Sequence, residues 1–186
     1  MVLRHELSGS QIGQGLNKKD PQVIKLMNQQ KQMIVSMGQF LGEEVMHVMR
    51  GMDRMQSSAQ IDGRQKTVSC PGRERTDTGR AGFPGTYKDA DPVDIRLGLL
   101  KIGDVMIGGV NAEVFNSIVR RLKKESPYAH TMMATLTNGS ARSGYIPNDE
   151  AYGMYTFEVV SSRLKPGCAE TSIVNGILDL MADPAR

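Results

Sequence analysis

The chain has 186 residues, of which 39% are hydrophobic, and its formal net charge is only +3. This length and composition predict one sizeable core, in a single domain or part of one that covers residues 1–186. The basic residues are spread along the chain, which argues against a nucleic-acid surface. No apolar run approaches the roughly 18 to 20 residues that a transmembrane helix requires.

The N-terminal region predicts a loop followed by helices. Residues 1–7 carry charges where a signal peptide would be apolar, and the glycine-rich stretch up to residue 20 is typical of a loop. Asp20-Pro21 supplies an N-cap and a proline at the first helical position of a polar helix. A second helix is predicted over about 32–52, packed on the sheet, because apolar residues recur at helical spacing. A lone His47 in this helix indicates a surface or packed residue rather than a metal ligand.

The next region predicts one strand and one long loop. Residues 61–69 partly alternate between apolar and polar types, which is typical of an exposed strand. Cys70-Pro71-Gly72 is expected to break that strand. The glycine- and proline-rich stretch 73–91 is then expected to be a long loop.

The centre of the chain predicts a hairpin, a helix and a third strand. Apolar residues alternate over 93–100, a Gly-Asp turn follows, and 104–109 returns as a short strand. The helix shows apolar residues at i, i+3, i+4 and i+7 from Phe115, with basic residues near its end, and it stops at Ser126-Pro127. Residues 130–137 form the next strand and lead into a glycine-rich loop.

The last elements complete an α/β architecture. Residues 156–160 are expected to be a strand, and a final helix begins at about Ala169. The expected fold is a mixed sheet of five strands, 61–69, 93–100, 104–109, 130–137 and 156–160, covered by four helices.

Two residues lie at positions where ligand sites of α/β proteins commonly occur, at the ends of strands and in the loops that follow them. Glu113 lies at a strand-to-helix junction, and Tyr145 lies in the glycine-rich loop after the next strand. The residues alone leave a second interpretation open. Glu113 is then an acid at a helix N-terminus, favoured by the helix dipole, and Tyr145 is a partly buried loop aromatic.

Three segments, GDVMIGGVNAEVFNSI, TLTNGSARSGYIPNDEAY and TFEVVSSRLKPGCAE, carry a family resemblance. They resemble the end of the catalytic domain of the neutral/alkaline ceramidases, zinc-dependent hydrolases that cleave the amide of N-acylsphingosines. The resemblance runs from about Cys70 to Met181. It implies that this α/β chain is the C-terminal part of a larger catalytic domain, and that its substrate is a lipid with a linear amide.

The resemblance also implies a set of zinc ligands. Glu113 and Tyr145 correspond by position to two of the family's ligands, with Tyr152 and Tyr155 as nearby alternatives to Tyr145. The chain departs from the family pattern with Asn111-Ala112 in place of Pro-Gly. The family's two histidine ligands and its serine nucleophile are not found here. We therefore expect half of a zinc site, no activity from this chain alone, and a partner that is the missing N-terminal half of an exported or cell-surface protein.

A second function from another class stays open. A non-catalytic α/β domain that binds a lipid or a partner protein would also lack the histidine pairs and the Pro-Gly before Glu113. Cys70 and Cys168 are not in a C-x-x-C arrangement, which excludes a zinc ribbon. Whether the two cysteines are bonded to each other stays open. An exported protein predicts a disulfide between them, with Cα atoms roughly 4.4 to 6.8 Å apart, and a cytosolic protein predicts two buried thiols.

The metal-site hypothesis makes a geometric prediction. The strands that precede Glu113 and Tyr145 must be parallel neighbours, because only then do their C-terminal ends reach the same edge of the sheet. The oxygens of the two side chains should lie within roughly 4 Å of each other. The Glu113 carboxylate should face a concave surface, left open where the missing half would dock, with apolar residues exposed around it.

Overall fold

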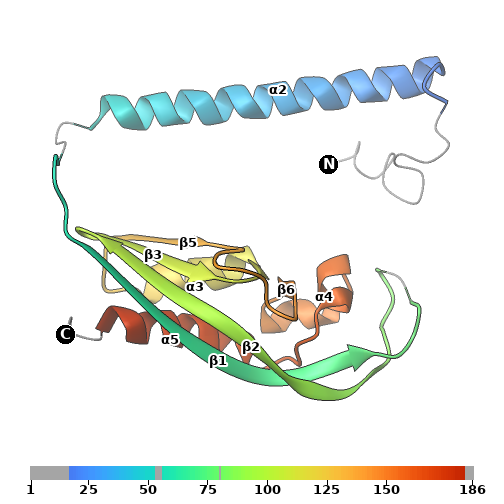
Figure 1. The fold of residues 1–186 in the computed structure, drawn as a ribbon. Coiled ribbons are helices and arrows are strands. Elements are labelled where there is room, and N and C mark those ends of the chain that lie inside the picture. The colour runs from blue at the N-terminus through green and yellow to red at the C-terminus, as the bar shows by residue number, and fades with distance from the viewer. Residues whose placement is uncertain (1–16, 53–55, 80, 183–186) are drawn as a thin grey trace. The chain divides into compact units, whose positions relative to one another are not determined.

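A computed structural model describes residues 17–52, 56–79 and 81–182 of the chain. It divides the chain into two units, Met1–Ser57 and Ser58–Arg186. The first unit is described mainly by one helix, and the second holds every strand (Figure 1). The prediction of a single or partial domain over the whole chain stays a prediction. Within the described residues, no helix combines the length and the apolar character needed to cross a membrane.

Helix α2 is one continuous element, Pro21–Arg50. The side chain of Asp20 accepts a hydrogen bond from the amide of Gln22, and Pro21 occupies the first turn, as the sequence predicts. The expectation of two separate helices is wrong, since residues 28–32 contain no glycine or proline that would end the first one. No residue of α2 is buried, and its packing on the sheet stays a prediction.

Strands β1 (Ile61–Arg75) and β2 (Tyr87–Ile102) form a long antiparallel hairpin. The predicted break at Pro71 is wrong. The pairing register shifts at a bulge between Cys70 and Gly72, so Pro71 needs no partner there, and β1 pairs with β2 again from Gly72 onward. A Cβ at Gly72 would lie 2.0 Å from the backbone oxygen of Asp91, so only glycine fits there. The expected loop over 73–91 therefore shrinks to residues 76–86.

Asp77 holds this hairpin loop together. Its carboxylate accepts hydrogen bonds from the Thr86 amide, from the Gly79 amide at 2.8 Å, from the Thr86 hydroxyl at 2.8 Å and from Arg75 Nε at 2.6 Å. These donors, the Thr86 amide above all, hold the pKa of Asp77 far below its usual range. The ionised carboxylate is thus part of the loop structure.

The lowered pKa of Asp77 predicts how the loop responds to acid. Because the folded pKa lies below the unfolded value of about 3.9, the stabilisation is present above that value and is lost as pH falls through the folded pKa. In an NMR titration from neutral pH down to about pH 3, the Asp77 carboxyl carbon should therefore show no complete transition. A midpoint near 4 would contradict the hydrogen-bonding scheme.

The remaining strands complete a four-stranded sheet of order β1-β2-β3-β5. Strand β3 (Val105–Val110) pairs antiparallel with β2, and β5 (His130–Ala134) pairs parallel with β3. Helix α3 (Asn116–Glu125) makes the crossover between these two parallel strands and ends at Ser126, as predicted. Strands β4 (Glu113–Val114) and β6 (Tyr145–Ile146) form a separate, parallel two-stranded sheet.

Helices α3 and α5 (Ala169–Ala182) cover one face of the sheet. The alternating apolar residues of β2 point to that face and are buried in one cluster, together with apolar residues of both helices: Val93, Ile95, Leu97, Leu99, Ile118, Leu122, Ile173 and Ile177. A disulfide joins Cys70 of β1 to Cys168, just before α5, with a Cα–Cα distance of 5.8 Å. This distance lies within the range predicted for a bridged pair.

The predicted strand over 156–160 is wrong. Residues Phe157–Ser161 form helix α4, which follows the short 3-10 helix η1 (Asp149–Gly153). Arg73 donates to the carbonyl oxygens of Val159 at 2.6 Å and of Ser162 at 3.1 Å, and so satisfies acceptors at the helix C-terminus. This long-range contact overrides the β propensity of the Val159-Val160 pair. The α/β class of the fold is as predicted.

Candidate metal centre

Glu113 and Tyr145 are direct partners in the parallel β4–β6 pair. The Glu113 amide donates to the Gly144 carbonyl at 2.8 Å, and the Phe115 amide donates to the Ile146 carbonyl at 3.1 Å. Paired residues of neighbouring strands are about 4.8 Å apart and present their side chains to the same side. The predicted parallel arrangement of the preceding strands, β3 and β5, is confirmed. The role of the two residues as metal ligands stays a prediction.

The side chain of Glu113 is exposed and belongs to a strand. Helix α3 begins at Asn116 after its N-cap Phe115, and its first turn contains no acidic residue. Glu113 therefore lies outside the first helical turn, two residues before the N-cap, and its interpretation as an acid favoured by the helix dipole stays a prediction. An exposed carboxylate outside the helix is free to bind a ligand.

Tyr145 is held from two sides. Its half-buried ring packs edge-on against Phe157, with 5.5 Å between ring centroids and an interplanar angle of 78°. Its carbonyl accepts a hydrogen bond at 3.0 Å from the hydroxyl of the fully buried Ser143, which also accepts the Arg163 amide at 2.9 Å. The ring and the backbone of Tyr145 are thus both fixed beside Glu113.

The two alternative tyrosines are engaged elsewhere. The Tyr152 hydroxyl donates to the Leu164 carbonyl at 3.0 Å, and its ring lies 4.9 Å from the Arg73 guanidinium. Burial raises the pKa of Tyr152, which disfavours the phenolate that a metal needs. The Tyr155 carbonyl accepts the Gly82 amide, which ties that residue to the β1–β2 loop. Of the three, Tyr145 alone pairs with Glu113 in the β4–β6 register.

Asn111, two residues before Glu113, orders the chain through two hydrogen bonds. Its side-chain oxygen accepts the Arg96 amide at 2.9 Å, and its own carbonyl accepts the Ala141 amide at 2.7 Å. The buried Asn111 therefore closes the β2–β3 ladder and turns the chain toward Glu113. Proline could not reproduce this side-chain contact, since it has no polar side-chain atom.

The described residues do not complete a zinc site. In the ranges 17–52, 56–79 and 81–182, no group of three or more His, Cys, Asp or Glu is placed to hold a metal. His130 opens β5 opposite Val105, at the far end of β3 from Glu113, and its imidazole lies 3.8 Å from Asp104. His47 lies in the other unit. The exposed carboxylate of Glu113 and the phenol of Tyr145 are both oxygen donors, and their part in a coordination shell stays a prediction.

Exposed apolar side chains occur near the pair, as predicted. The Leu136 amide donates to the carbonyl of Ala112, next to Glu113, and the Leu136 side chain is exposed. Phe157 is also exposed although it touches Tyr145. Met154 and Tyr155, just before α4, extend the exposed apolar surface.

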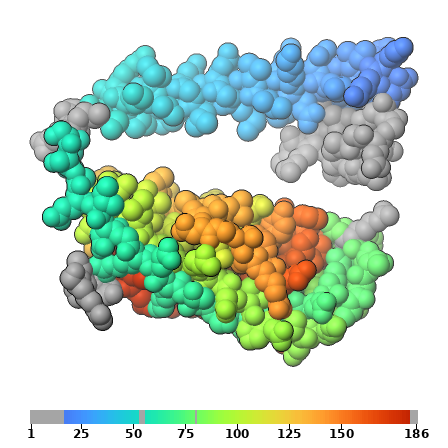
Figure 2. Space-filling view, viewed as in Figure 1, coloured from blue at the N-terminus to red at the C-terminus, as the bar shows by residue number. Residues whose placement is uncertain are grey.

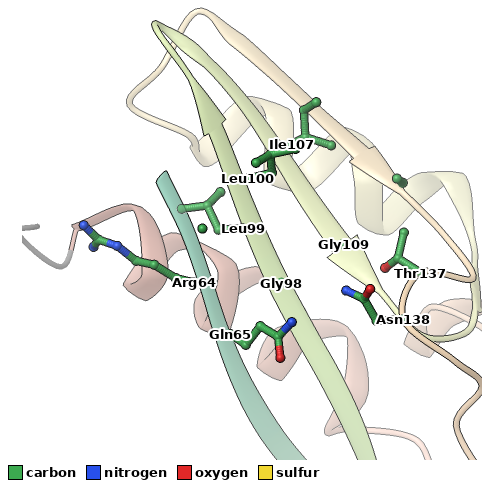
Figure 3. Close-up of a pocket in the computed structure, with 11 residues that line it drawn as sticks. Arg64, Gln65, Gly98, Leu99, Leu100, Ile107, Gly109, Thr137 and Asn138 are labelled. Carbon is green, nitrogen blue, oxygen red and sulfur yellow. The ribbon is translucent and has the colours of Figure 1, made fainter. Parts of the chain in front are cut away.

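A separate hollow of about 590 Å³ lies on the sheet face opposite the helices (Figure 3). Gly98 and Gly109 are paired across β2 and β3 and leave its floor without side chains. Gln65, Thr137 and Asn138 supply polar groups at its margin. Sequence reasoning missed this hollow, although glycines at facing strand positions are a signal that can be sought.

Comparison of the chain with known protein families, curated proteins and solved structures finds no match.

Proposed function

We propose that this chain contributes Glu113 and Tyr145 to the zinc site of a ceramidase-like amidohydrolase that acts on N-acylsphingosines. The observation that supports this best is their direct pairing in β4–β6. They lie 32 positions apart in sequence, yet the crossover through α3 brings them side by side. The resemblance selected these two positions independently of their spatial arrangement.

Each residue has a distinct task in the proposed site. The Glu113 carboxylate would bind the metal directly, whereas the Tyr145 phenol would bind after losing its proton. Ser143 and Phe157 would orient Tyr145 through its backbone and its ring. The zinc ion, when bound, supplies a Lewis acid that polarises the amide carbonyl of the substrate.

The proposal requires ligands from outside this chain. A histidine-bearing segment, the N-terminal half of the same protein, would complete the coordination shell and supply the nucleophile. The exposed apolar residues Leu136, Met154 and Phe157 suit a surface that such a segment covers. The Cys70–Cys168 disulfide supports an exported or cell-surface location, since disulfides persist in oxidising compartments.

The second candidate is a non-catalytic α/β domain that binds a lipid or a protein. The hollow on the sheet face opposite α3 and α5 favours it, because Leu100 and Ile107 give this hollow an apolar lining without zinc ligands. The DNA upstream of Met1 discriminates the two. A continuous reading frame with a signal peptide and several histidine codons supports the hydrolase, and a ribosome-binding site directly before Met1 supports the binding domain.

The purified 186-residue chain should bind Zn²⁺ weakly and should not hydrolyse N-acylsphingosine. Two ligands hold zinc far less tightly than the three or four protein ligands of natural sites. The measurement is release of fatty acid from an N-acylsphingosine by the zinc-loaded chain, compared with zinc alone. Robust turnover by this chain would contradict the proposal that residues outside the 186-residue chain complete the site.

A further inference from the structure

Helix α2 exposes apolar side chains in its first two turns and again from Met33 to Met49, on either side of the polar residues 28–32. None of its residues is buried, and Figure 2 shows α2 as a single elongated helix. Monomeric soluble proteins rarely expose large continuous apolar patches, so a surface of this size indicates an interface. The exposed large apolar residues are Ile24, Met27, Met33, Ile34, Val35, Met37, Phe40, Leu41, Val45, Met46, Val48 and Met49.

These side chains extend well beyond one face of the helix. Successive residues of an α-helix are about 100° apart, which places Ile34, Leu41, Val45 and Val48 in one stripe, here called the apolar seam. Val35 and Met46 flank it on one side and Met33 and Phe40 on the other. The remaining side, here called the polar arc, carries only polar residues from Lys25 onward: Lys25, Gln29, Gln32, Ser36, Gln39, Glu43, His47 and Arg50.

The breadth of the apolar surface restricts the kind of partner. A helix that lies on a membrane surface keeps a wide, strongly charged face toward water, and the polar arc of α2 is narrow and carries few charges. A helix that is apolar around most of its circumference is typically enclosed by other helices. Gly38 and Gly42 add to this, since nothing lies within 4 Å of a Cβ built on either, and a neighbouring backbone could approach closely there.

The charges of α2 favour one orientation of a second copy. Lysines lie in and just before its first half, at Lys18, Lys19, Lys25 and Lys31, beside the N-cap Asp20, whereas its second half holds Glu43, Glu44 and one basic residue, Arg50. With Ile34 opposite Leu41 in an antiparallel pair, Lys31 lies opposite Glu44, and Lys25 lies opposite Arg50. Parallel copies would align these like charges, and antiparallel copies bring the lysine-bearing half of one beside the acidic half of the other. Antiparallel helix dipoles are also opposed.

We propose that α2 is a self-association surface, through which copies of this chain pack their α2 helices antiparallel around the apolar seam. The 30 residues of α2 allow a packed seam about 45 Å long, since an α-helix rises about 1.5 Å per residue. The proposal concerns the first unit of the chain and does not depend on the zinc site of the second.

The test is the concentration dependence of the molar mass of the full chain, measured by light scattering after size exclusion. We expect dimers or larger even-numbered assemblies at micromolar concentration. Ile34→Lys with Leu41→Lys should weaken association at least about 100-fold, because two lysines then enter a packed apolar interface. The matched control, Gln32→Lys with Gln39→Lys, adds the same charge at the same spacing on the polar arc and should still associate.

Crosslinking tests the orientation. The two cysteines of the chain are bonded to each other, so introduced cysteines are its only free thiols. Oxidation should link chains that carry both Met27→Cys and Val48→Cys, which face each other across an antiparallel pair, and should not link chains with Met27→Cys alone. A monomer at every concentration, equal loss of association in both lysine variants, or efficient linking through Met27→Cys alone would overturn the proposal. A monomer that binds phosphatidylcholine–phosphatidylglycerol vesicles would replace it with a membrane surface.

Discussion

Removal of the Cys70–Cys168 disulfide should lower the free energy of unfolding of residues 58–186 by about 2 to 5 kcal/mol. The bridge spans 98 positions, so it constrains a long loop of the unfolded chain. It also fastens α5 to β1 beside the bulge, where Cys70 is fully buried. Without it, α5 is held to the sheet by apolar packing, by the hydrogen bond from Arg64 to the Leu180 carbonyl and by the exposed Lys66–Asp179 ion pair.

Urea unfolding of the Cys70→Ala, Cys168→Ala double variant provides the measurement, with the intrinsic tyrosine signal of the sheet unit as the probe. Reduction of the natural chain should give a similar loss, because it removes the same constraint without changing the side-chain carbons. An unchanged midpoint after complete reduction would mean that the bridge does not constrain this unit.

Leu97→Ala should destabilise the same unit by about 2 to 5 kcal/mol. Leu97 is fully buried at the centre of β2, and it fills the space that Gly176 leaves on α5. A Cβ built on Gly176 would lie only 2.4 Å from Leu97 Cδ1. The two positions therefore share one volume between the helix and the sheet.

This shared volume predicts a coupling between the two positions. Gly176→Ala should destabilise the natural chain by strain and should be tolerated in the Leu97→Ala background, with a coupling energy of about 0.5 to 3 kcal/mol in a double-mutant cycle. Leu100→Ala is the matched control, since that leucine lies on the uncovered face and is 39% exposed. Additive effects of Leu97→Ala and Gly176→Ala would contradict the packing described here.

The sequence pattern predicted an element correctly where the spacing of its apolar residues matches the face that the element buries. The alternation from Val93 to Leu99 indicated a strand buried on one face, and the spacing from Phe115 to Leu122 indicated α3. The pairing of Glu113 with Tyr145 was also predictable, because a helical crossover makes adjacent strands parallel.

Long-range contacts decided the elements that local patterns missed. Pro71 interrupts no strand because the bulge beside it lets β1 continue. Val159 and Val160 favour a strand locally, yet Arg73 from β1 satisfies the carbonyls of a helix there. The donors that would complete the proposed zinc shell could not be found in this way, since His130 lies at the far end of β3 from Glu113.

A Zn²⁺ titration of the 186-residue chain, followed by NMR of its tyrosine rings and glutamate carboxyl carbons, tests the zinc-site proposal most directly. We expect the signals of Tyr145 and Glu113 to shift together and to saturate at one zinc ion per chain. Glu113→Gln or Tyr145→Phe should abolish both shifts, whereas the exposed controls Glu150→Gln and Tyr155→Phe should preserve them. Shifts that centre on His47 or His130, or that survive both site variants, would contradict the proposed site.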